Sequence, residues 1–291
     1  MSLLNDYFQD KYTGDHPDDE RFTKEPGEYH ASQVSNCHRY WYWDFTRQGE
    51  DDWSPYFELG RMFETMYGRA LRWKYGDNRV QQDVEFEMHL SDDVTLVGES
   101  DWVIVEEDTE PIDKVIIDQD NHREFVRRDP KVDLRERLDN LRQDVNSLGR
   151  VPGNVNDVVD NLKDYLGEPR EETYHYDGQI EKVIETKTTK KIEWRQKYGH
   201  KRNHQYQLAC YMWAFDAPGE IVYMTRNEAD QMVFEFERDV KVETDIEIRA
   251  LKHHRNLIND TVPGTNPMTE NQCKYCEYED SCKEIGGSRW Q

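Results

Sequence analysis

The chain has 291 residues, 35% of them hydrophobic and 34% charged, and its 38 basic and 61 acidic residues give a net charge of −23 at pH 7. This length suits one large domain, or one domain with an insertion, and 12% aromatic residues can build a core, which argues against disorder. Such an acidic surface repels nucleic acid on average, so either nucleic acid is not the partner or a local basic patch does the binding. We favour the second alternative, with the acidity as an adaptation to a high-salt cytoplasm.

Location and thiol chemistry can be inferred from what the chain lacks. No run of 18 apolar residues is present, so we expect no transmembrane helix. The first ten residues are polar and acidic, unlike a secretory signal, and we expect a cytoplasmic protein. Thiols stay reduced there, so the five cysteines are more typical of ligands, core residues or catalytic groups than of disulfides.

The first third of the chain alternates between loop, helix and strand patterns. Residues 1–30 are polar and turn-prone and are interpreted as a leader, and the aromatic-rich segment 31–48 is predicted to form a short helix. Apolar residues recur every three or four positions over 56–74, which predicts an amphipathic helix. Alternating apolar and polar residues predict strands at 84–90 and about 94–106.

Residues 107–178 differ in character and are interpreted as an insertion between two strands. They begin with charged, irregular sequence, and then leucine and valine residues recur at helical spacing on both sides of a turn at 149–153. This pattern predicts a helical hairpin over 132–166. The hairpin is either a solvated cap or an arm that binds a partner protein.

The second half returns to regular elements. Strands are predicted at 179–187, 220–226 and 231–237, and helices at 203–215 and 241–259. The element order favours an α/β sandwich with a mixed central sheet flanked by helices. The core would then comprise residues 31–106 and 179–262, and residues 263–291 would form a separate cysteine-rich segment.

The motif Glu185-Thr186-Lys187 ends an apolar strand. Strand alternation places Glu185 and Lys187 on one face, roughly 6–7 Å apart. The carboxylate can hold a divalent cation, and the ammonium can orient water and stabilise charge on a phosphate. Residues 129–131 and 239–241 match the same loose pattern, and a surface ion pair would explain any one of the three alone.

Two further acids strengthen this interpretation. Asp101 lies within an apolar strand, where a carboxylate is costly to bury without a partner or a metal ion. Glu64 lies on the amphipathic helix. Three carboxylates from a helix and two strands are a reasonable set of oxygen ligands for a hard cation such as Mg²⁺. Downstream, Gln207 and Tyr211 lie four residues apart on one helix face, where both can bind a phosphate or a catalytic neighbour, or simply be boundary residues.

This ordered set, G-x3-E at 60–64, G-x2-D at 98–101, E-T-K at 185–187 and Q-x3-Y at 207–211, resembles the RecB-like branch of the PD-(D/E)XK nucleases. The resemblance implies a restriction-endonuclease-like core and ligation of Mg²⁺ or Mn²⁺ by Asp101 and Glu185, with the Thr186 carbonyl often added. It also implies Lys187 as the catalytic lysine, with Gln207 and Tyr211 as supporting and DNA-contacting residues. The chain departs from the branch at Glu64, where histidine is usual, but glutamate can also bind Mg²⁺ or Mn²⁺.

Four of the five cysteines suit a metal site. Cys273, Cys276 and Cys282 form a C-x2-C-x5-C motif, and Cys37 is a good fourth ligand. Cys210 lies among apolar residues of the 203–215 helix and is interpreted as a core residue. The spacing suits zinc and an iron–sulfur cluster equally well.

The segment 32–39 (S-Q-V-S-N-C-H-R) and the terminal cysteine motif, on either side of a RecB-like core, resemble the CRISPR-associated protein 4 family and related helicase-linked nucleases. The resemblance implies a [4Fe–4S] cluster on the four cysteines. Such a cluster would link the beginning of the chain to its end and stabilise the fold.

The most basic stretch of the chain begins at Lys187 and contains a single acid, Glu193. Aromatic residues interleave with its cations, a composition that suits a path for single-stranded nucleic acid but also a solvated loop. Its candidate DNA-binding residues after Lys187 are Lys190, Lys191, Arg195, Lys197, Lys201 and Arg202.

These patterns lead to two functional hypotheses. The first is a Mg²⁺- or Mn²⁺-dependent DNA exonuclease that acts on single-stranded ends or overhangs. The family resemblance implies CRISPR spacer acquisition, or recombination and repair, and a viral relative is equally consistent. The second is a non-catalytic iron–sulfur subunit that binds DNA or assembles with partners.

Overall fold

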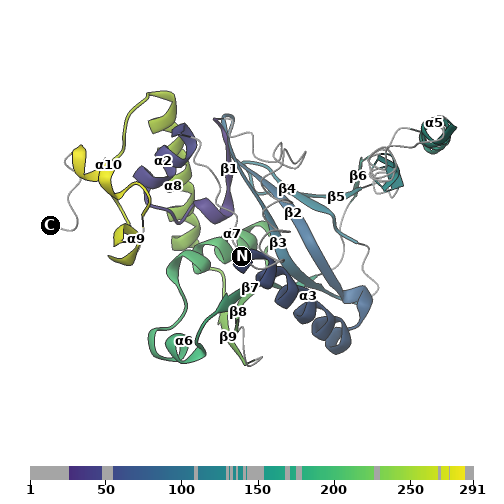
Figure 1. Ribbon diagram of the computed structural model, residues 1–291, viewed down its shortest axis with the longest axis horizontal. Coiled ribbons are helices and arrows are strands. Elements are labelled where there is room, and N and C mark those ends of the chain that lie inside the picture. The colour runs from purple at the N-terminus through teal and green to yellow at the C-terminus, as the bar shows by residue number, and fades with distance from the viewer. Residues whose placement is uncertain are drawn as a thin grey trace, which may run out of the picture.

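The computed structural model describes residues 26–47, 55–107, 111–128, 154–167, 171–174, 179–225, 230–267, 270–274 and 276–285, with a few positions between 131 and 142. Within these residues one mixed sheet has the strand order β6-β5-β4-β2-β3-β7-β8-β9, and β1 pairs with β3. Helices flank this sheet on both faces (Figure 1). The predicted α/β fold with a mixed central sheet is confirmed.

Five of the nine strands in the described residues lie where the apolar pattern predicted them, and the other four were not predicted. The strands are β1 (Glu28–His30), β2 (Val80–Ser91), β3 (Val94–Val105), β4 (Lys114–Ile117), β5 (Arg123–Arg128), β6 (Glu171–Tyr174), β7 (Ile180–Thr189), β8 (Gly219–Thr225) and β9 (Gln231–Phe236). β7 lies between β3, to which it is antiparallel, and β8, to which it is parallel. Both neighbours pair with β7 and both of its faces are covered, so its middle, residues 183–186, is buried. A charged residue in this stretch is therefore placed inside the molecule.

The longer helices match the predicted periodicity, whereas the short helices at 192–198, 270–274 and 279–284 were not predicted. The helices are α2 (His38–Arg47), α3 (Pro55–Tyr75), α5 (Asn154–Leu166), α6 (Ile192–Tyr198), α7 (Arg202–Phe215), α8 (Val240–Ile258), α9 (Glu270–Lys274) and α10 (Glu279–Glu284), with short 3-10 turns η2 (Ala31–Gln33) and η3 (Asp77–Arg79). No helix in the described part of the chain combines the length and apolar character that a membrane span needs.

α3 packs closely against one face of the sheet. A Cβ at Gly68 would lie 2.0 Å from the ring of Trp102, a fully buried residue of β3, so only glycine allows this approach. Leu71 joins Trp102, Ile184 and Val222 in the apolar cluster beneath the helix. This contact sets the height of α3 above β3 and β7.

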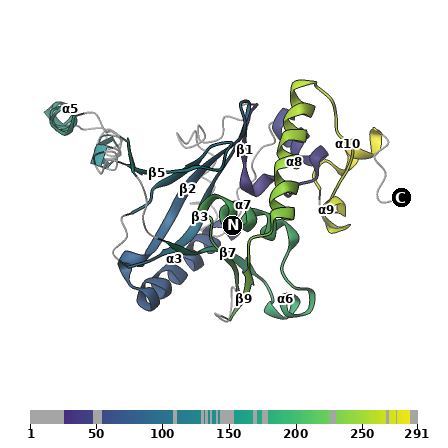
Figure 2. The ribbon, with the colours of Figure 1, turned by 180° about the vertical axis from the view of Figure 1, so that it is seen from behind.

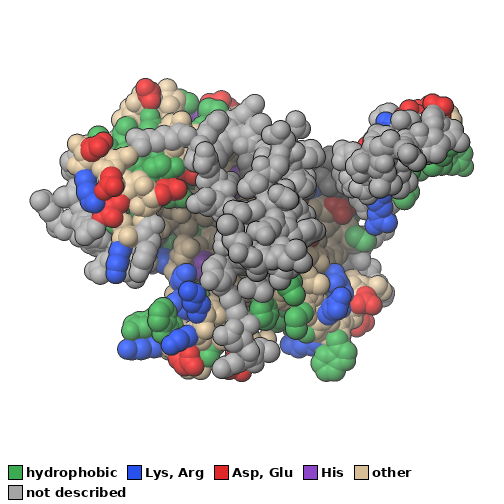
Figure 3. Space-filling model, in the orientation of Figure 1, with side chains coloured by type: hydrophobic (Ala, Val, Ile, Leu, Met, Phe, Trp, Pro, Cys, Tyr) green, Lys and Arg blue, Asp and Glu red, His purple; other side chains and the backbone are tan. Residues whose placement is uncertain are grey.

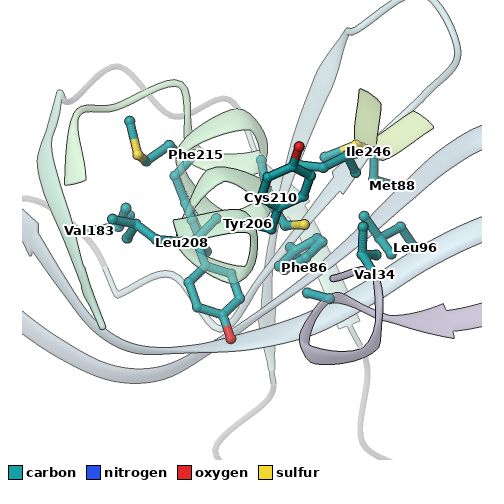
Figure 4. Packing of buried hydrophobic residues seen from close by; sticks show 14 of the residues in the cluster. Val34, Phe86, Met88, Leu96, Val183, Tyr206, Leu208, Cys210, Phe215 and Ile246 are labelled. Carbon is teal, nitrogen blue, oxygen red and sulfur yellow. The ribbon is translucent and has the colours of Figure 1, made fainter. Parts of the chain in front are cut away.

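α7 covers the opposite face and forms the centre of the main core (Figure 4). Leu208 and Cys210 are fully buried, and Leu208 packs in one cluster with Val183 and Ile221 of the sheet. The interpretation of Cys210 as a core residue is confirmed, and burial raises the pKa of its thiol well above the ordinary range.

The two ends of the described chain meet at α8, as both ribbon views show (Figures 1 and 2). Arg249 of α8 donates to the carbonyls of Val34 and Asn36 at 2.8 and 2.5 Å. β1 differs from the predicted polar leader, because Tyr29 is buried and pairs with Leu96. Residues 1–25 of that leader lie outside the described residues.

The insertion also differs from its prediction. Residues 111–128 were expected to be irregular, but β4 and β5 extend the sheet beyond β2. Val115 and Ile117 of β4 are buried and alternate with the partly exposed Lys114 and Ile116. α5 confirms the second helix of the hairpin, and helical positions around Asp139 and Arg142 contact it through the ion pairs Lys163–Asp139 and Arg142–Asp160. The rest of the first helix lies outside the described residues.

Candidate active site

The E-T-K motif lies on the central strand β7. Glu185 is fully buried, and its carboxylate forms an ion pair with Lys187, whose side chain is 27% exposed. Among the described residues, no hydrogen-bond donor reaches the buried Oε2 atom of Glu185. Burial, reinforced by the charge of Asp101, raises the pKa of Glu185 to about 8. A cation bound at this oxygen would relieve both the missing contact and the charge penalty.

Asp101 reaches the same place from β3. Its Oδ2 accepts two hydrogen bonds from Thr186, one from the backbone N–H and one from the hydroxyl, both at 2.6 Å. These bonds fix the carboxylate beside β7. Burial lowers the pKa of the Lys187 ammonium, but the charges of Glu185 and Asp101 outweigh this effect, and the net shift is upward. Lys187 therefore carries a proton at neutral pH.

Glu64 approaches from α3. Burial and the charge of Asp101 raise its pKa to about 7, and it also interacts with Lys187. Glu64, Asp101 and Glu185 therefore share one electrostatic neighbourhood. Their oxygens do not all lie within 4.8 Å of one another, as the ligands of a closed shell around one ion would. The arrangement suits Mg²⁺, which binds through one or two carboxylates and keeps several waters.

The Q-x3-Y motif borders the site from α7. Gln207 Nε2 donates to the hydroxyl of Tyr211 at 2.7 Å. Tyr211 is buried, and burial together with the charges of Glu185 and Asp101 raises its pKa well above the ordinary value. Its hydroxyl stays protonated and is held beside the carboxylates, so the two motif residues act as one hydrogen-bonded unit.

Two more acids surround Asp101. Asp83 of β2 lies across the β2–β3 ladder from Asp101, between the pairs Gln82–Trp102 and Val84–Ser100, and has a left-handed φ of 55°. Burial and the charge of Asp83 raise the pKa of Glu99 to about 7. Neither Asp83 nor Glu99 was predicted as a site residue. Glu99 precedes Asp101 by two positions on the same strand, and this spacing was the available signal.

The basic segment does not face the site uniformly. Lys190 and Lys191 follow β7 and are exposed, Lys197 lies with its ammonium 5.0 Å from the Tyr198 ring centroid, and Arg202 donates to the Tyr206 hydroxyl at 3.2 Å. Lys201 interacts electrostatically with both Arg195 and Lys187. Basic side chains gather around α6 in the space-filling view (Figure 3).

The four predicted cysteine ligands come together between α2 and α10. Asn266 N–H donates to the sulfur of Cys37 and Arg39 donates to the sulfur of Cys282, both at 3.4 Å. Burial and the charges of the other three thiols raise the pKa of Cys276 to about 11, which reflects their proximity. No three of these sulfurs lie within 4.8 Å of one another. Four sulfurs bound at 2.3 Å to a single zinc ion would lie about 4 Å apart.

In the described residues one group of side chains has its possible metal-ligand atoms within 4.8 Å of one another. It consists of Asp118, Asp120 and His122. All three are exposed in the turn between β4 and β5. Asp118 accepts hydrogen bonds from the backbone N–H groups of Asp120 and His122, both at 2.9 Å. This group is explained as a hydrogen-bonded turn.

A mixed sheet flanked by helices, with an E-x-K motif on a central strand and an aspartate on its neighbour, is consistent with the PD-(D/E)XK nuclease core. Comparison with protein families agrees, since residues 177–283 match the PD-(D/E)XK nuclease superfamily. The matched segment contains the E-T-K motif, the Q-x3-Y motif and the three C-terminal cysteines. Comparison with curated proteins found no match.

Solved structures give a likeness of fold. The crystal structure of SSO0001 is similar with a TM-score of 0.53 and 14% identity, over 100% of this chain and 98% of that one. An alkaline exonuclease, LHK-Exo from Laribacter hongkongensis, has a TM-score of 0.46 and 11% identity, over 83% of this chain and 93% of that one. The likeness to SSO0001 concerns the fold alone.

Proposed function

We propose that this protein is a metal-dependent DNA nuclease, and that it acts as an exonuclease on single-stranded ends. The observation that carries the proposal is the buried Glu185 carboxylate, whose Oε2 has no hydrogen-bond donor, beside Lys187 and Asp101. A structural ion pair would leave no reason to bury an unsatisfied oxygen on a central strand. The superfamily match over the same strand supports this assignment.

The residues present fit a Mg²⁺ or Mn²⁺ ion. Glu185 and Asp101 would hold it, with the Thr186 carbonyl and Glu64 as further oxygen ligands, directly or through water. When bound, the ion would polarise the scissile phosphate and activate a water molecule. Lys187 stays protonated, so it would orient the attacking water and stabilise negative charge on the phosphate. Gln207 and Tyr211 would hold the neighbouring phosphate oxygens or the carboxylates in place.

Cleavage of end-labelled single-stranded DNA, with and without Mg²⁺ and in high KCl, tests the proposal. We expect Mg²⁺-dependent shortening from an end, and its loss in Lys187→Ala and in Glu185→Ala. The matched control is Lys241→Ala, because Asp239-Val240-Lys241 repeats the sequence pattern but Asp239 caps α8 through the Lys241 N–H at 2.9 Å. Cleavage that survives both active-site changes rejects the assignment.

Binding without cleavage would instead favour the non-catalytic alternative. In that case the wild type binds the labelled strand in every metal tested but leaves its length unchanged. The family resemblance implies that the nuclease trims DNA ends in CRISPR spacer acquisition or in recombination and repair. This role depends on the nuclease proposal and would be rejected together with it.

We further propose that Cys37, Cys273, Cys276 and Cys282 hold a [4Fe–4S] cluster. The support is the C-x2-C-x5-C motif, the approach of Cys37 to it, and two N–H donors directed at the sulfurs, as iron–sulfur sites favour. The same four thiols could hold one zinc ion, and the resemblance to the CRISPR-associated protein 4 family favours the cluster.

The cluster proposal has a direct spectroscopic test. Anaerobically purified protein should be brown and contain iron and sulfide, and Cys276→Ser should lose the colour. Cys210→Ala, a buried cysteine outside the group, should keep it. A colourless wild type with stoichiometric zinc would reject the iron–sulfur assignment but leave the nuclease proposal standing.

One feature of α5 supports the prediction that the helical hairpin binds a partner protein. Val158, Leu162 and Tyr165 recur along one stripe of α5 and are exposed, Tyr165 by 89%. α5 lies at the far end of the molecule from α8 and α10 (Figure 1). We retain this stripe as the proposed contact for a protein partner.

A further inference from the structure

A compact polar group lies beside the catalytic lysine, on the neighbouring strand. Tyr223 of β8 pairs in register with Lys187 of β7, so both side chains rise from the same face of the sheet. The Tyr223 hydroxyl accepts a hydrogen bond from the Lys201 N–H at 3.0 Å and lies 2.9 Å from His204 Nδ1. One tyrosine therefore fixes the first turn of α7 above the end of β7.

Cations converge on this tyrosine. The Arg195 guanidinium lies 5.4 Å from the Tyr223 ring centroid and donates to the Gly199 carbonyl at 3.2 Å. Desolvation, and then the charges of Arg195 and Lys187, lower the pKa of the Lys201 ammonium. Among the described residues neither Arg195 nor Lys201 forms an ion pair with a carboxylate, although the chain as a whole has an excess of acids. Unpaired, mutually repelling cations are stabilised by an anion between them.

His204 adds an uncharged donor. Burial and the neighbouring charges of Lys187, Lys201 and Arg195 lower its pKa to about 2, so the imidazole is neutral. The other groups around the Tyr223 hydroxyl are donors, so its proton goes to His204 Nδ1. The remaining ring proton is then on Nε2, where it can be donated to a ligand.

We propose that Arg195, Lys201 and His204, positioned by Tyr223, bind the phosphate next to the scissile phosphate in the DNA strand. This inference rests on the proposed nuclease function, because Lys187 marks the scissile position. The site lies one strand from Lys187, a step of about 4.8 Å, which is within the reach of one nucleotide. Binding of the neighbouring phosphate would fix the position of the DNA strand along the site, so that the phosphorus of the scissile phosphate lies opposite Lys187.

The geometry separates these residues from the other cations of the segment. Lys197 extends over Tyr198 on the exposed side of α6, and it appears in none of the charge interactions of Lys187, Lys201 or His204. Lys197→Ala therefore removes the same charge from the same segment without touching the proposed subsite. It is the matched control for Lys201→Ala.

The first measurement needs no catalysis. Affinity for a short single strand is measured in EDTA over a range of KCl concentrations, because each phosphate contact adds roughly 0.7 to the slope of log K against log salt. Lys201→Ala should lower the slope by about that amount and weaken binding severalfold, whereas Lys197→Ala should lower it less. An unchanged slope in Lys201→Ala, or equal losses in both variants, overturns the subsite.

The second measurement locates the bound phosphate. A single methylphosphonate, which removes one phosphate charge, is placed beside a defined scissile bond. Wild-type cleavage of that bond should slow by about tenfold, and Lys201→Ala should be slow on both strands with no further loss. Additive losses overturn the subsite while cleavage itself upholds the nuclease.

Tyr223→Phe keeps every charge and tests positioning. It should raise KM for the all-phosphate strand and leave the methylphosphonate strand unaffected. Equal effects on both strands reject the positioning role. If the wild type shows the Lys201-dependent salt slope but does not cleave, the nuclease proposal fails, and so does the claim that the bound phosphate adjoins a scissile one.

Discussion

Glu185 combines features that are hard to reconcile in a metal-free protein. Its carboxylate is fully buried, one oxygen has no donor, and its pKa is raised to about 8 by burial and by Asp101. Such a residue destabilises the fold unless it gains a cation. The same group that would bind the metal therefore couples metal binding to stability.

This coupling gives a prediction at the residue scale. Adding Mg²⁺ should raise the Tm of the wild type, since a ligand at ten times its Kd stabilises the native state by about 1.4 kcal/mol. Glu185→Gln removes the buried charge, so its Tm without metal should equal or exceed that of the wild type, and Mg²⁺ should leave it unchanged. Thermal unfolding in EDTA and in MgCl₂ measures both. An equal Mg²⁺ response in the variant contradicts the assigned role of Glu185.

Some site residues are recognisable from the sequence and others are not. Glu185, Lys187 and Asp101 stand out because charged residues interrupt apolar strands, and the structure places them together. Asp83, Tyr223 and His204 carry no such signal, since a tyrosine in a strand is ordinary core. Their relevance depends on the pairing of β2 with β3 and of β7 with β8, which local sequence does not specify.

At the scale of elements, the position of Glu64 depends on how closely α3 approaches the sheet. Gly68→Ala would place a methyl group against the rigid, buried ring of Trp102 and should destabilise the protein by about 1–3 kcal/mol. It should also weaken metal-dependent activity, because α3 carries Glu64. Chemical denaturation and the cleavage assay would detect the two effects.

Gly60→Ala is the matched control on the same helix. A Cβ there meets nothing within 4 Å, so the substitution should be neutral or stabilise α3 by up to about 1 kcal/mol. Similar losses of stability at both positions would mean that the contact with Trp102 does not limit the packing of α3.

The junction between α8 and the N-terminal elements contains a buried histidine. His253 is fully buried and stacks on Trp41 with ring centroids 3.9 Å apart. Neither of its ring nitrogens has a hydrogen-bond partner in the part of the chain that the structure describes. Burial, together with the charges of His38 and His254, lowers its pKa to about 3. A neutral imidazole is therefore built into this interface.

The pH dependence of stability follows from this shift. Above the unfolded pKa of about 6.5 both states are neutral, and His253 adds no pH dependence. Between about 6.5 and 3 only the unfolded state binds the proton, so stability falls as pH falls, by up to about 1.4 kcal/mol per pH unit. His253→Phe keeps an aromatic ring but cannot titrate, and its stability should fall less steeply over this window. Urea denaturation at several pH values compares the slopes, and identical slopes would contradict the assignment.

At the scale of the whole molecule, the charge of −23 opposes both folding and DNA binding. Screening of this repulsion should raise the Tm as KCl increases, and the rise should flatten once the Debye length falls from about 10 Å at 0.1 M to about 3 Å at 1 M. Thermal unfolding in KCl and NaCl of equal ionic strength should give the same rise. A decrease, or a rise specific to one salt, would contradict simple screening.

DNA binding should respond to salt in the opposite direction, because the basic residues around α6 act locally within an acidic molecule. A protein adapted to high salt would keep cleaving in KCl concentrations at which its own repulsion is screened. High KCl is therefore the condition in which the cleavage assay should be run.

The sequence by itself determined the periodicity of most helices and strands, the position of the E-T-K motif and the clustering of three cysteines. These features are local, because apolar spacing and short motifs depend only on neighbouring residues. Tertiary structure decided the rest. It added β4 and β5 to the sheet, brought Cys37 to the C-terminal thiols and set Tyr223, His204 and Lys201 beside Lys187. Strand pairing and chain closure join residues that are distant in sequence, and no local pattern specifies which distant partners will meet.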